Sequence, residues 1–401
     1  MFLNQLLKSF IQVGTLRIID SHGKTYVYSG SPGKNVTIKL HNKKIKHQLF
    51  WQSELALGEG YMNGAITIEQ GDLRDLLDLC TQNLSLNAHH ASLTQKIAFL
   101  FSKFSCYFQQ YNPLSLSRRY ISHHYDMNQE FIQLFLDRDL QYSCAYFNNI
   151  EEDTLEKAQE NKKYHISKKL LLQPGQRVLD IGSGWGGMAL YLAKHANVEV
   201  TGLTLSKDQY MIATERAKQA GLSDRVKFYL RDYREEKNKY DRIVSVGMFE
   251  HVGTPHFQTY FNQAYNLLND DGIMLLHAIG ATSSPRPTNP WIRKYIFPGG
   301  YCPSLSEVFP TVEKSKLIVT DMEILHNHYA ETLKHWRERF LNNWDKAKNL
   351  YNETFCRMWE YYLTSCETAF RNQDLMIFQI QLTRNKNNVP STRDYLYKNS
   401  I

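Results

Sequence analysis

The sequence of 401 residues predicts an α/β protein, with a doubly wound parallel sheet that follows a smaller N-terminal α+β domain. Helical and β-rich segments alternate from Ser167 onward, whereas short β-rich segments separated by Gly and Pro turns open the chain. A chain of this length rarely forms a single core. We therefore expect two domains, 1–115 and 116–401, divided just after the break at Asn112-Pro113.

The N-terminal domain is expected to begin with a short amphipathic helix, because apolar residues recur at helical spacing between Phe2 and Ile11. We favour packing of this helix on its own domain over binding to a bilayer. Three segments within 15–42 (TLRIID, KTYVYSG, NVTIKLHN) predict a small antiparallel sheet. GEGYMNG at 58–64 predicts a turn-rich loop, and the stretches GDLRDLLDLC at 71–80 and 91–111 predict helices.

A basic cluster precedes an aromatic one in HNKKIKHQLFW, residues 41–51. Lys43, Lys44 and Lys46 are followed by Leu49, Phe50 and Trp51. This order is typical of a monotopic membrane contact, where cations meet anionic headgroups and Trp lies at the interface. A solvated strand that runs into the core has the same pattern. The sequence alone leaves both interpretations open.

The composition excludes several classes of protein. A formal charge of +7 over 401 residues is too dilute for a nucleic-acid partner, and 42% hydrophobic residues exclude a mostly disordered chain. No run of about 18 uncharged apolar residues predicts a membrane span, and no secretory leader is recognisable. The high aromatic content, 13%, suits an apolar or cationic ligand or a membrane interface, as well as an aromatic-rich core.

The six cysteines are scattered and form no C-x-x-C pair, so we expect neither a disulfide scaffold nor a metal site. Free thiols fit a reducing cytoplasm. The cysteines are Cys80, Cys106, Cys144, Cys302, Cys356 and Cys366.

The elements of the second domain follow the order expected for parallel strands joined by helices. After a helix that ends near Leu172, the sequence predicts the strand RVLDIG, the helix GMALYLAKHA, the strand VEVTGLTL, the helix KDQYMIATERAKQAG, the strands VKFYLRD and DRIVSVGMF, the helix HFQTYFNQAYNLL and the strand GIMLLHAIG. Ligands of such sheets bind beyond the carboxyl ends of the strands.

The loop VLDIGSGWGG carries Gly182, Gly184 and Gly187 in a G-x-G-x-x-G pattern between a strand and a helix. A nicotinamide dinucleotide site carries an acid about 20 residues further on, but the strand that ends near Thr204 has none. S-adenosylmethionine (SAM) needs close backbone approach, which glycines permit, and Asp180 can fix its amino group or the loop. LTLS, LRDY and DRIVSVGMFEH complete the motif order of a Rossmann-like class I methyltransferase, which favours SAM.

These and further segments resemble the cyclopropane-fatty-acyl-phospholipid synthases and the related mycolic acid cyclopropane synthases. The resemblance covers nearly all of the chain beyond Ser122 and is weaker at GEGYMNG. It is carried by HHYDMNQEFIQLFLDRDLQYSCAYF, VLDIGSGWGG, GLTLSKDQ, DRIVSVGMFEHVG, LLHAIG, PWIRKYIFPGGYCPSL, HYAETLKHWRERF and YYLTSCETAFRNQD.

The resemblance implies methyl transfer from SAM to a cis double bond of a phospholipid acyl chain, followed by proton loss that closes a cyclopropane ring. It also implies a bicarbonate ion as proton acceptor. An acid, an imidazole, a hydroxyl and a peptide N–H can satisfy the oxygens of such an anion. Carried over by position, its ligands are Cys144, Glu250, His277, the N–H of Ile279, and Tyr329. The pKa of Glu250 is expected to be raised beside an anion.

For SAM, the resemblance assigns a larger set of residues. Gln209 would reach the ribose hydroxyls, and Asp232 would accept from the adenine amino group. Structural alternatives stay open, since Tyr142 can belong to the core, Asp232 can cap a helix and the serines can close turns. The full set is Tyr142, Ser143, Gly182, Ser183, Gly184, Thr204, Leu205, Ser206, Gln209, Asp232 and Tyr233.

Cys366 matches a cysteine once regarded as a nucleophile in this family. Alkene methylation gives a thiol nucleophile no evident task, so we favour a structural role in an apolar helix. Departures from the family pattern are Ser183 in place of a common Cys, Ala278 in place of Thr, and Ala330 in place of Asp. The last can loosen the orientation of Tyr329, but none removes a ligand of the anion.

The leading hypothesis is thus a cyclopropane synthase that acts on unsaturated phospholipids in the cytoplasm, bound peripherally to the inner face of the membrane. Alternatives are a methyltransferase that makes methyl-branched acyl chains and, in a different class, a lipid-binding protein without catalysis. The resemblance also suggests a homodimer.

Overall fold

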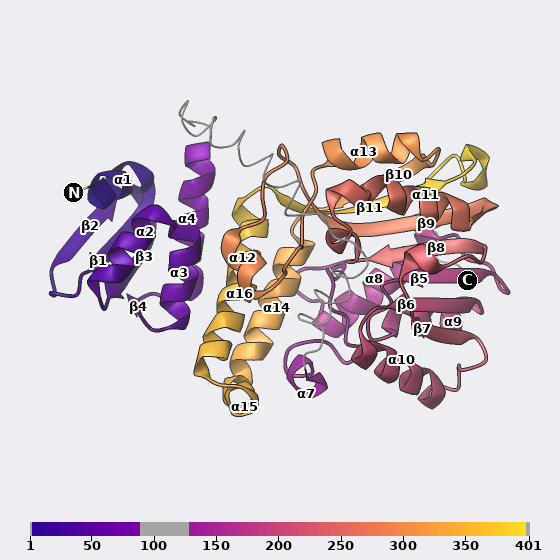
Figure 1. Cartoon of the computed structure of the whole chain (residues 1–401), viewed down its shortest axis with the longest axis horizontal. Helices are drawn as coiled ribbons and strands as arrows, with labels where there is room; N and C mark the ends of the chain where they lie inside the picture. Colours follow the sequence, from indigo (N-terminus) through magenta and orange to yellow (C-terminus); the bar gives the residue numbers. More distant parts are fainter. Residues whose placement is uncertain (1, 89–127, 398–401) are drawn as a thin grey trace. The chain divides into compact units, whose positions relative to one another are not determined.

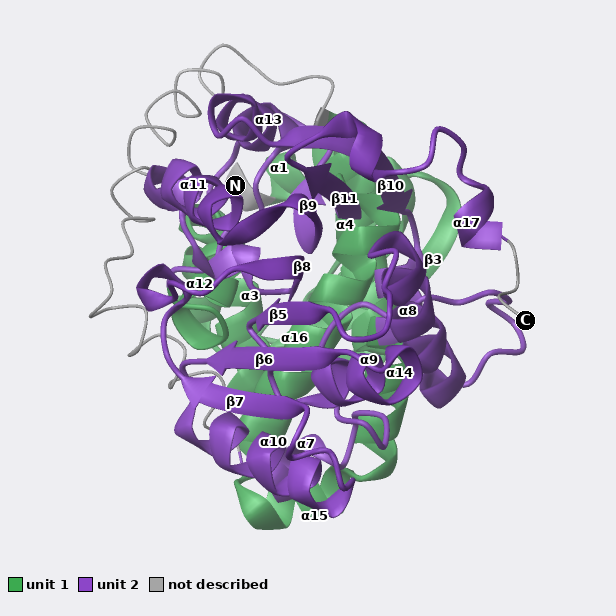
Figure 2. Cartoon of the chain, turned by 90° about the vertical axis from the view of Figure 1, so that its right-hand side faces the viewer, with its two compact units in different colours: residues 1–102, 288–298, 333–374 green, residues 103–287, 299–332, 375–401 purple. Residues whose placement is uncertain are grey.

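A computed structural model describes residues 2–88 and 128–397, and its contacts divide the chain into two compact units (Figures 1 and 2). The first unit comprises residues 1–102, 288–298 and 333–374, and the second unit comprises 103–287, 299–332 and 375–401. Both units are therefore discontinuous in sequence, unlike the segments 1–115 and 116–401. That boundary, and the helix expected at 91–111, lie outside the described residues.

The first unit opens with the expected helix, α1 (Phe2–Phe10), and a four-stranded sheet of order β2-β1-β3-β4. The strands are β1 (Val13–Ile19), β2 (Thr25–Ser29), β3 (Ser31–Leu40) and β4 (Ile66–Gln70). The expectation of a wholly antiparallel sheet is wrong, because β1 pairs with β3 in parallel. At Gly30 the chain reverses so closely that a Cβ would lie 2.0 Å from the carbonyl oxygen of Gln12, so β3 returns along the other edge of β1.

Three helices follow the first strands, α2 (Lys43–Trp51), α3 (Ser53–Met62) and α4 (Leu73–Ala88). The strand interpretation of 43–51 is wrong, since Asn42 caps a helix there by accepting from Ile45 N–H at 2.9 Å. The loop expected at 58–64 is also wrong for Gly58 and Gly60, which belong to α3. A Cβ on Gly58 would lie 2.4 Å from the Trp291 ring, so the glycine permits close packing rather than a turn.

The remaining helices of the first unit come from later in the chain. They are α12 (Pro290–Tyr295), α15 (Trp344–Leu350), α16 (Glu353–Asn372) and the part of α14 (His328–Asn342) from Leu333 onward. On α16 the buried carboxylate of Glu367 is bonded by Arg74, Arg337 and Arg371, which offsets the cost of burying its charge.

The second unit contains a seven-stranded sheet of order β10-β11-β9-β8-β5-β6-β7 (Figure 1). Its strands are β5 (Arg177–Ile181), β6 (Glu199–Thr204), β7 (Val226–Leu230), β8 (Tyr240–Val246), β9 (Leu268–Ala281), β10 (Ile318–Leu325) and β11 (Leu375–Thr383). Strands β5 to β9 are parallel to their neighbours, as predicted, whereas β11 and β10 are antiparallel additions. The Rossmann-like fold class is confirmed.

Helices cover both faces of this sheet, as a doubly wound fold requires. Successive side chains of one strand pack on opposite faces of the sheet, so Ile243 and Val244 of β8 belong to two different hydrophobic cores. One core includes side chains of α11 (Phe257–Leu267) and α13 (Leu305–Lys314), and the other those of α8 (Leu155–Lys169), α9 (Gly187–Ala196) and α10 (Lys207–Gln219). Strands buried on both sides account for the nearly continuous apolar runs in the sequence.

Short elements complete the second unit: α7 (Gln129–Ile132), η1 (Tyr233–Glu235), η2 (Phe249–His251), η3 (Thr254–His256), η4 (Lys386–Asn388) and α17 (Asp394–Tyr397). Among the residues that the structure describes, no helix has the length and apolar character to cross a bilayer. The same residues include no group of three or more His, Cys, Asp or Glu arranged to hold a metal ion.

Candidate active site

A pocket lies at the carboxyl ends of the parallel strands, where ligands of such sheets bind. The turns that follow β5, β6, β7 and β8 all contribute to it, together with the segment 140–143. Ten of the eleven predicted SAM-binding residues line this pocket: Tyr142, Ser143, Gly182, Ser183, Gly184, Thr204, Leu205, Gln209, Asp232 and Tyr233.

The glycine turn after β5 is built by backbone hydrogen bonds to the neighbouring strand. The N–H groups of Gly182 and Ser183 both donate to the carbonyl of Leu203, at 3.0 and 2.9 Å. Gly182 and Gly184 have φ values of +83° and +52°, in the left-handed region. Nothing lies within 4 Å of a Cβ built on Gly184, so the backbone there is open to a ligand.

The turn after β6 is fixed by side chains. Thr204 Oγ1 donates to Gln209 Oε1 at 2.8 Å, which orients the Gln209 amide at the pocket wall. Ser206 is the exception among the predicted SAM residues, since it does not line the pocket. Its hydroxyl accepts from the N–H of Gln209 at 3.3 Å and so caps α10.

After β7, both carboxylate oxygens of Asp232 are bonded to Arg234. Arg234 Nε donates to Oδ1 and Nη2 to Oδ2, each at 2.8 Å, and Oδ1 also accepts from Arg234 N–H. Asp232 therefore does cap η1, the structural alternative left open by the sequence. The proposed adenine contact would use the remaining lone pairs of these oxygens.

The structure brings Glu250 and Ile279 together, but the N–H that the resemblance assigns to the anion is bonded to Glu250. The N–H of Ile279 donates to Glu250 Oε1 at 2.6 Å, and Glu250 Oε2 is buried without a hydrogen-bond partner. Burial raises the pKa of Glu250 to about 7, against the opposing effect of the Ile279 bond. Met248 and His251, on either side of Glu250, line the pocket, whereas Glu250 itself and the other predicted anion ligands, Cys144, His277, Ile279 and Tyr329, are not among its lining residues.

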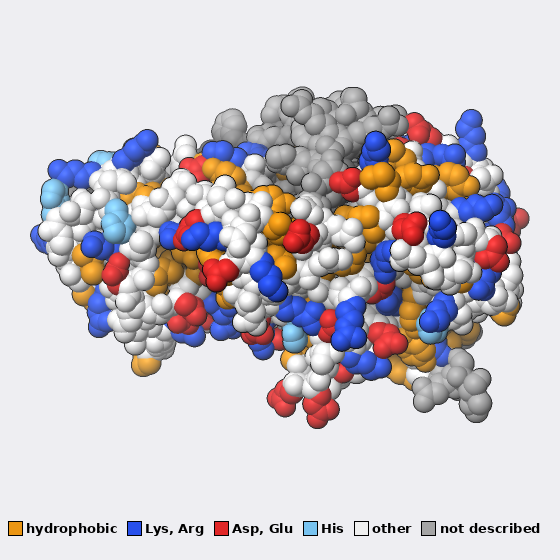
Figure 3. Space-filling model, turned by 90° about the horizontal axis from the view of Figure 1, so that it is seen from below, with side chains coloured by type: hydrophobic (Ala, Val, Ile, Leu, Met, Phe, Trp, Pro, Cys, Tyr) orange, Lys and Arg blue, Asp and Glu red, His pale blue; other side chains and the backbone are white. Residues whose placement is uncertain are grey.

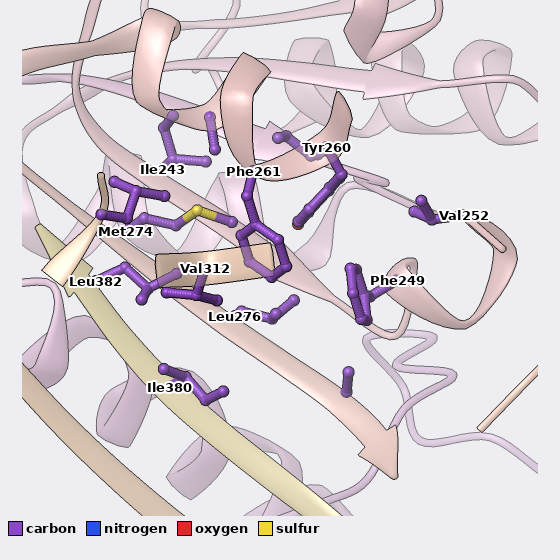
Figure 4. Close-up of a cluster of buried hydrophobic side chains, with 14 of the residues drawn as sticks. Ile243, Phe249, Val252, Tyr260, Phe261, Met274, Leu276, Val312, Ile380 and Leu382 are labelled. Atoms are coloured by element: carbon purple, nitrogen blue, oxygen red, sulfur yellow. The ribbon is translucent and has the colours of Figure 1, made fainter. Parts of the chain in front are cut away.

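An aromatic cluster fixes the turn that carries Glu250 (Figure 4). The ring of Phe249 lies 5.0 Å from Tyr260 and 5.5 Å from Phe261, measured between ring centroids. Both partners lie on α11, so the core between helix and sheet holds η2 in place. Such packing keeps a buried carboxylate in one position.

His277 lies two residues before Ile279 on β9. Its Nδ1 lies 3.1 Å from Gln379 Nε2 of the paired strand β11, and its Nε2 is buried without a hydrogen-bond partner. Burial, reinforced by Lys162, lowers the pKa of His277 to about 3, so the ring is neutral near pH 7. With Nδ1 facing the donor Gln379, Nε2 carries the proton and is available to donate.

Cys144 and Tyr329 lie on segments that are bonded to each other. The N–H of Ala145 donates to Thr332 Oγ1 and that of Phe147 to His328 Nδ1, both at 3.0 Å. Thr332 and His328 flank Tyr329 in the first turns of α14. Cys144 is buried, and burial raises the pKa of its thiol, which is therefore protonated and inert as a nucleophile.

Cys366 lies on α16, which belongs to the first unit, whereas the residues described above belong to the second unit. Burial raises the pKa of its thiol to about 12. A thiol of that pKa carries almost no thiolate near neutral pH.

Sequence reasoning missed the contribution of α8. Its Gln159 and Lys162 are fully buried and hold the segment 141–143 of the pocket wall. The signal was present in the sequence, because these polar residues occupy the helical face that also presents Leu155, Ala158 and Ile166 to the interior. Polar side chains at core positions of a helix are costly unless they serve a defined partner.

Comparisons with known proteins find relatives in sequence and in structure. A family model described as mycolic acid cyclopropane synthetase matches residues 114–380, and one for a domain of unknown function matches 2–92. The cyclopropane-fatty-acyl-phospholipid synthase of Escherichia coli is 38% identical over 353 residues, 88% of each chain. A probable fatty acid methyltransferase of Pseudomonas putida is 33% identical over 92% of this chain and 93% of its own. The crystal structure of the mycolic acid cyclopropane synthase CmaA1 complexed with SAH and CTAB matches 66% of this chain and 97% of its own, at 33% identity and a TM-score of 0.63.

Proposed function

This chain belongs to the mycolic acid cyclopropane synthetase family, and on that premise we propose that it converts cis double bonds of phospholipid acyl chains to cyclopropane rings with SAM as methyl donor. The observation that carries the proposal is the position of Glu250. Its carboxylate is buried with one oxygen that has no hydrogen-bond partner, and its chain neighbours Met248 and His251 line the pocket formed by the glycine turn, which supports a shared position for cofactor and proton acceptor.

The pocket residues fit SAM. Asp180, on β5, has Oδ2 buried without a hydrogen-bond partner, and it lines the pocket together with the open backbone of Gly184. A cationic amino group would satisfy this oxygen, and the glycine turn would admit the amino-acid end. Gln209 and Asp232 would hold ribose and adenine. When bound, SAM supplies a methyl group on a positively charged sulfur.

The residues around Glu250 fit a small anion such as bicarbonate. Glu250 Oε2 and His277 Nε2 are both buried without hydrogen-bond partners, and such atoms are costly unless a ligand or water satisfies them. Glu250, His277, Cys144 and Tyr329 would hold it, whereas the N–H of Ile279 is already bonded to Glu250 Oε1 and would act through that carboxylate. Bicarbonate would supply a proton acceptor at the reacting carbon.

Cyclopropane formation requires a site that excludes water, stabilises a carbocation and accepts one proton. The alkene forms a carbon–carbon bond to the transferred methyl and becomes a carbocation, and loss of a proton from that methyl closes the ring. Tyr142, Trp185 and Tyr233 line the pocket, and aromatic faces stabilise cations. Glu250, with its pKa of about 7, can share a proton at Oε2, whereas neutral His277 can donate from Nε2.

Access to phospholipid requires contact with a bilayer, and we propose α2 as that contact. Lys43, His47 and Trp51 recur every four residues and so share one face, and all three are exposed, Trp51 by 79%. Lys44 extends the basic part of this surface. On the face shown in Figure 3, basic side chains are spread among acidic and apolar ones, so a local cluster matters more than the net charge. Peripheral binding at the cytoplasmic face would follow.

Methyl-branched acyl chains are the second candidate product. The related protein of Pseudomonas putida is described as a probable fatty acid methyltransferase, and it matches this chain over a larger share than the Escherichia coli synthase does. Both products share methyl transfer and the same carbocation. They differ in which proton leaves the carbocation. Loss from the transferred methyl closes the ring, whereas loss from a neighbouring chain carbon gives a methyl-branched chain that keeps a double bond.

The test is to incubate the protein with methyl-labelled SAM and vesicles of a mono-unsaturated phospholipid, then release and analyse the fatty acids. We expect labelled acyl chains larger by one methylene, with the upfield proton resonances of a cyclopropane ring. A labelled branched chain without those resonances would favour the second candidate. Transfer of label to an amine, or binding of vesicles without any transfer, would overturn the proposal. The suggested homodimer is tested separately by sedimentation of the free protein.

A further inference from the structure

Helix α8 reaches the pocket wall through two fully buried polar side chains one turn apart. Lys162 Nζ donates to Gln141 Oε1 and to Ser143 Oγ, each at 2.7 Å. Gln159 Nε2 donates to the carbonyl of Ser143 at 2.9 Å. Gln141 and Ser143 line the pocket, and Cys144 follows directly. Helix α8 therefore positions the segment 141–143, which forms one wall of the predicted SAM pocket, and with it Cys144, a predicted ligand of the anion.

The two acceptors of Lys162 are neutral, although a buried ammonium is costly without a negative partner. The charged groups that act on it are Asp137, Asp139, Asp180 and Lys163. Its own charge acts on the Cys144 thiol and on the His277 imidazole, lowering the pKa of both. Lys162 thus lies within electrostatic range of two predicted ligands of the anion.

The predicted anion site has a deficit of positive charge. Glu250 is an acid, Cys144 and Tyr329 are neutral, and His277 is neutral because its pKa is lowered to about 3. A small anion beside a carboxyl group in a buried site is repelled unless a cation compensates. A compensating cation need not touch the anion, because charges interact over several ångströms in sites that exclude water.

We propose that Lys162 is the positioning residue that joins the two parts of the active site and supplies the positive charge for anion binding. Through Gln141 and Ser143 it orders the pocket wall, and from behind that wall its ammonium stabilises the anion held by Cys144 and His277. The inference rests on the proposed function in that the anion is bicarbonate. The competing assignment makes Lys162 only a counter-charge for the nearby acids, Asp137 and Asp180 above all.

The experiment measures bicarbonate binding directly. Purified protein saturated with SAH is titrated with sodium bicarbonate, against sodium chloride at equal ionic strength and pH, and the rise in Tm gives an apparent Kd. The variants are Lys162→Met, which removes the charge at similar volume, and Lys162→Arg, which keeps it. Lys163→Met is the matched control, because the adjacent lysine is also buried but bonds Asp139, which reaches the wall only through Gln141 Nε2, and makes no direct bond to Gln141 or Ser143. Calorimetry gives the Kd for SAH of each protein.

We expect Lys162→Met to raise the bicarbonate Kd at least about tenfold and the SAH Kd by a clearly smaller factor, because the anion loses its compensating charge whereas SAH loses only the bonds that order one wall of its pocket. Lys162→Arg and Lys163→Met should retain most of the bicarbonate response. An equal response in wild type and Lys162→Met would overturn the assignment while leaving the proposed function intact, and so would loss of SAH affinity alone. A wild-type protein that neither binds bicarbonate nor depends on it for turnover would overturn both.

A second variant covers the case in which Lys162→Met does not fold. Ser143→Ala removes one of the two acceptors of Lys162 with little change in volume, so the ammonium loses its fixed position. The bicarbonate Kd should then rise at least about threefold with the unfolding transition intact, since a lost hydrogen bond to a charged group typically costs that much or more. An unchanged Kd in a folded Ser143→Ala protein would contradict the proposal.

Discussion

The backbone N–H of Ile279 on β9 donates a 2.6 Å hydrogen bond to Oε1 of Glu250 on η2. This bond fixes one carboxylate oxygen and leaves the other, Oε2, buried without a hydrogen-bond partner. The bond between Ile279 and Glu250 thus leaves Oε2 of Glu250 as the oxygen that can exchange a proton. Because burial raises the pKa of Glu250 to about 7, the group can exist in either protonation state near neutral pH.

Replacement of Glu250 by Gln should abolish most turnover while leaving cofactor binding in place. The amide keeps the shape and the bond to Ile279 but cannot share a proton, and general acid–base groups typically accelerate a reaction by about two to four orders of magnitude. We expect turnover in the labelled-phospholipid assay to fall by at least about two orders of magnitude, with the SAH Kd changed less than about threefold. Glu313→Gln, at an exposed site on α13, is the control. Retained turnover in Glu250→Gln would remove this residue from the mechanism.

The same substitution should change how stability depends on pH. The pKa of Glu250 is about 7 in the folded chain against an ordinary value of 4.5, so the unfolded chain loses this proton first as the pH rises. Stability contributed by the protonated form is therefore complete below about pH 4.5 and lost as the pH approaches 7. The shift corresponds to about 3 kcal/mol as an order of magnitude.

Glu250→Gln lacks this titration, so its stability relative to wild type should increase between about pH 5 and pH 8. Urea unfolding of both proteins at several pH values measures the difference. A difference that stays constant with pH would show that Glu250 is ionised in the folded protein throughout.

The sequence predicted the second unit well because its signals are local. Apolar runs, the glycine turn after β5 and the helix N-terminus after β6 each occupy a few consecutive residues, and the structure places them as expected. The antiparallel strands β10 and β11 and the discontinuous first unit depend on contacts between distant segments. Periodicity carries no information about such pairing.

For the site, the resemblance identified residues that line the pocket, and the hydrogen bonds of the structure explain how those residues are held in position. Residue type alone could not distinguish ligand binding from helix capping at Ser206 and Asp232. Both side chains make local capping bonds, and Ser and Asp are common in either role. Lys162 was missed for the opposite reason. A lysine within a charged helix is normally solvated, and this general expectation outweighs the local signal that Lys162 shares a helical face with Leu155 and Ile166, although the fold buries it completely.

Gly58 should tolerate no larger residue. The GEGYMNG segment looked like a turn, but a Cβ on Gly58 would lie 2.4 Å from the Trp291 ring, closer than any real contact. Gly58→Ala should gain helix propensity yet lose about 1 to 3 kcal/mol of stability through overpacking against that ring. Denaturant unfolding measures the loss, with Ser53→Ala at the exposed start of α3 as the control. Equal stability of Gly58→Ala and wild type would contradict the packing argument.

Cys366 should be dispensable for chemistry. Its thiol pKa of about 12 leaves almost no thiolate at neutral pH, and it is not among the residues that line the pocket. Cys366→Ala should keep turnover within about threefold of wild type and lower Tm slightly, because a small, half-buried side chain is lost. If the variant instead loses about two orders of magnitude of turnover at unchanged Tm and SAH affinity, the thiol regains a catalytic role.

Membrane binding should depend on α2 through two separable contributions. The exposed Lys43 and Lys44 attract anionic headgroups at about 1 kcal/mol each, an effect that salt screens, whereas the half-buried Lys46 lies over the Tyr26 ring and contributes less. Trp51, exposed by 79%, contributes apolar burial that salt does not weaken. Reversal of the three lysines to Glu should thus weaken binding to anionic vesicles strongly at low salt and little at high salt. Trp51→Ala should weaken it at both.

Vesicle sedimentation over a range of salt concentrations separates these contributions, and a charge-matched variant supplies the control. Lys207, Lys218 and Lys227 are exposed on the second unit, and their reversal to Glu changes the net charge equally. If α2 is the docking surface, only its own reversal abolishes the salt-sensitive part. Equal losses from both triple variants would mean that net charge alone drives binding, and unchanged binding of the α2 variant would exclude this helix as the contact. Because the label assay uses vesicles, weakened docking should raise KM for lipid without lowering kcat, which distinguishes it from damage to the active site.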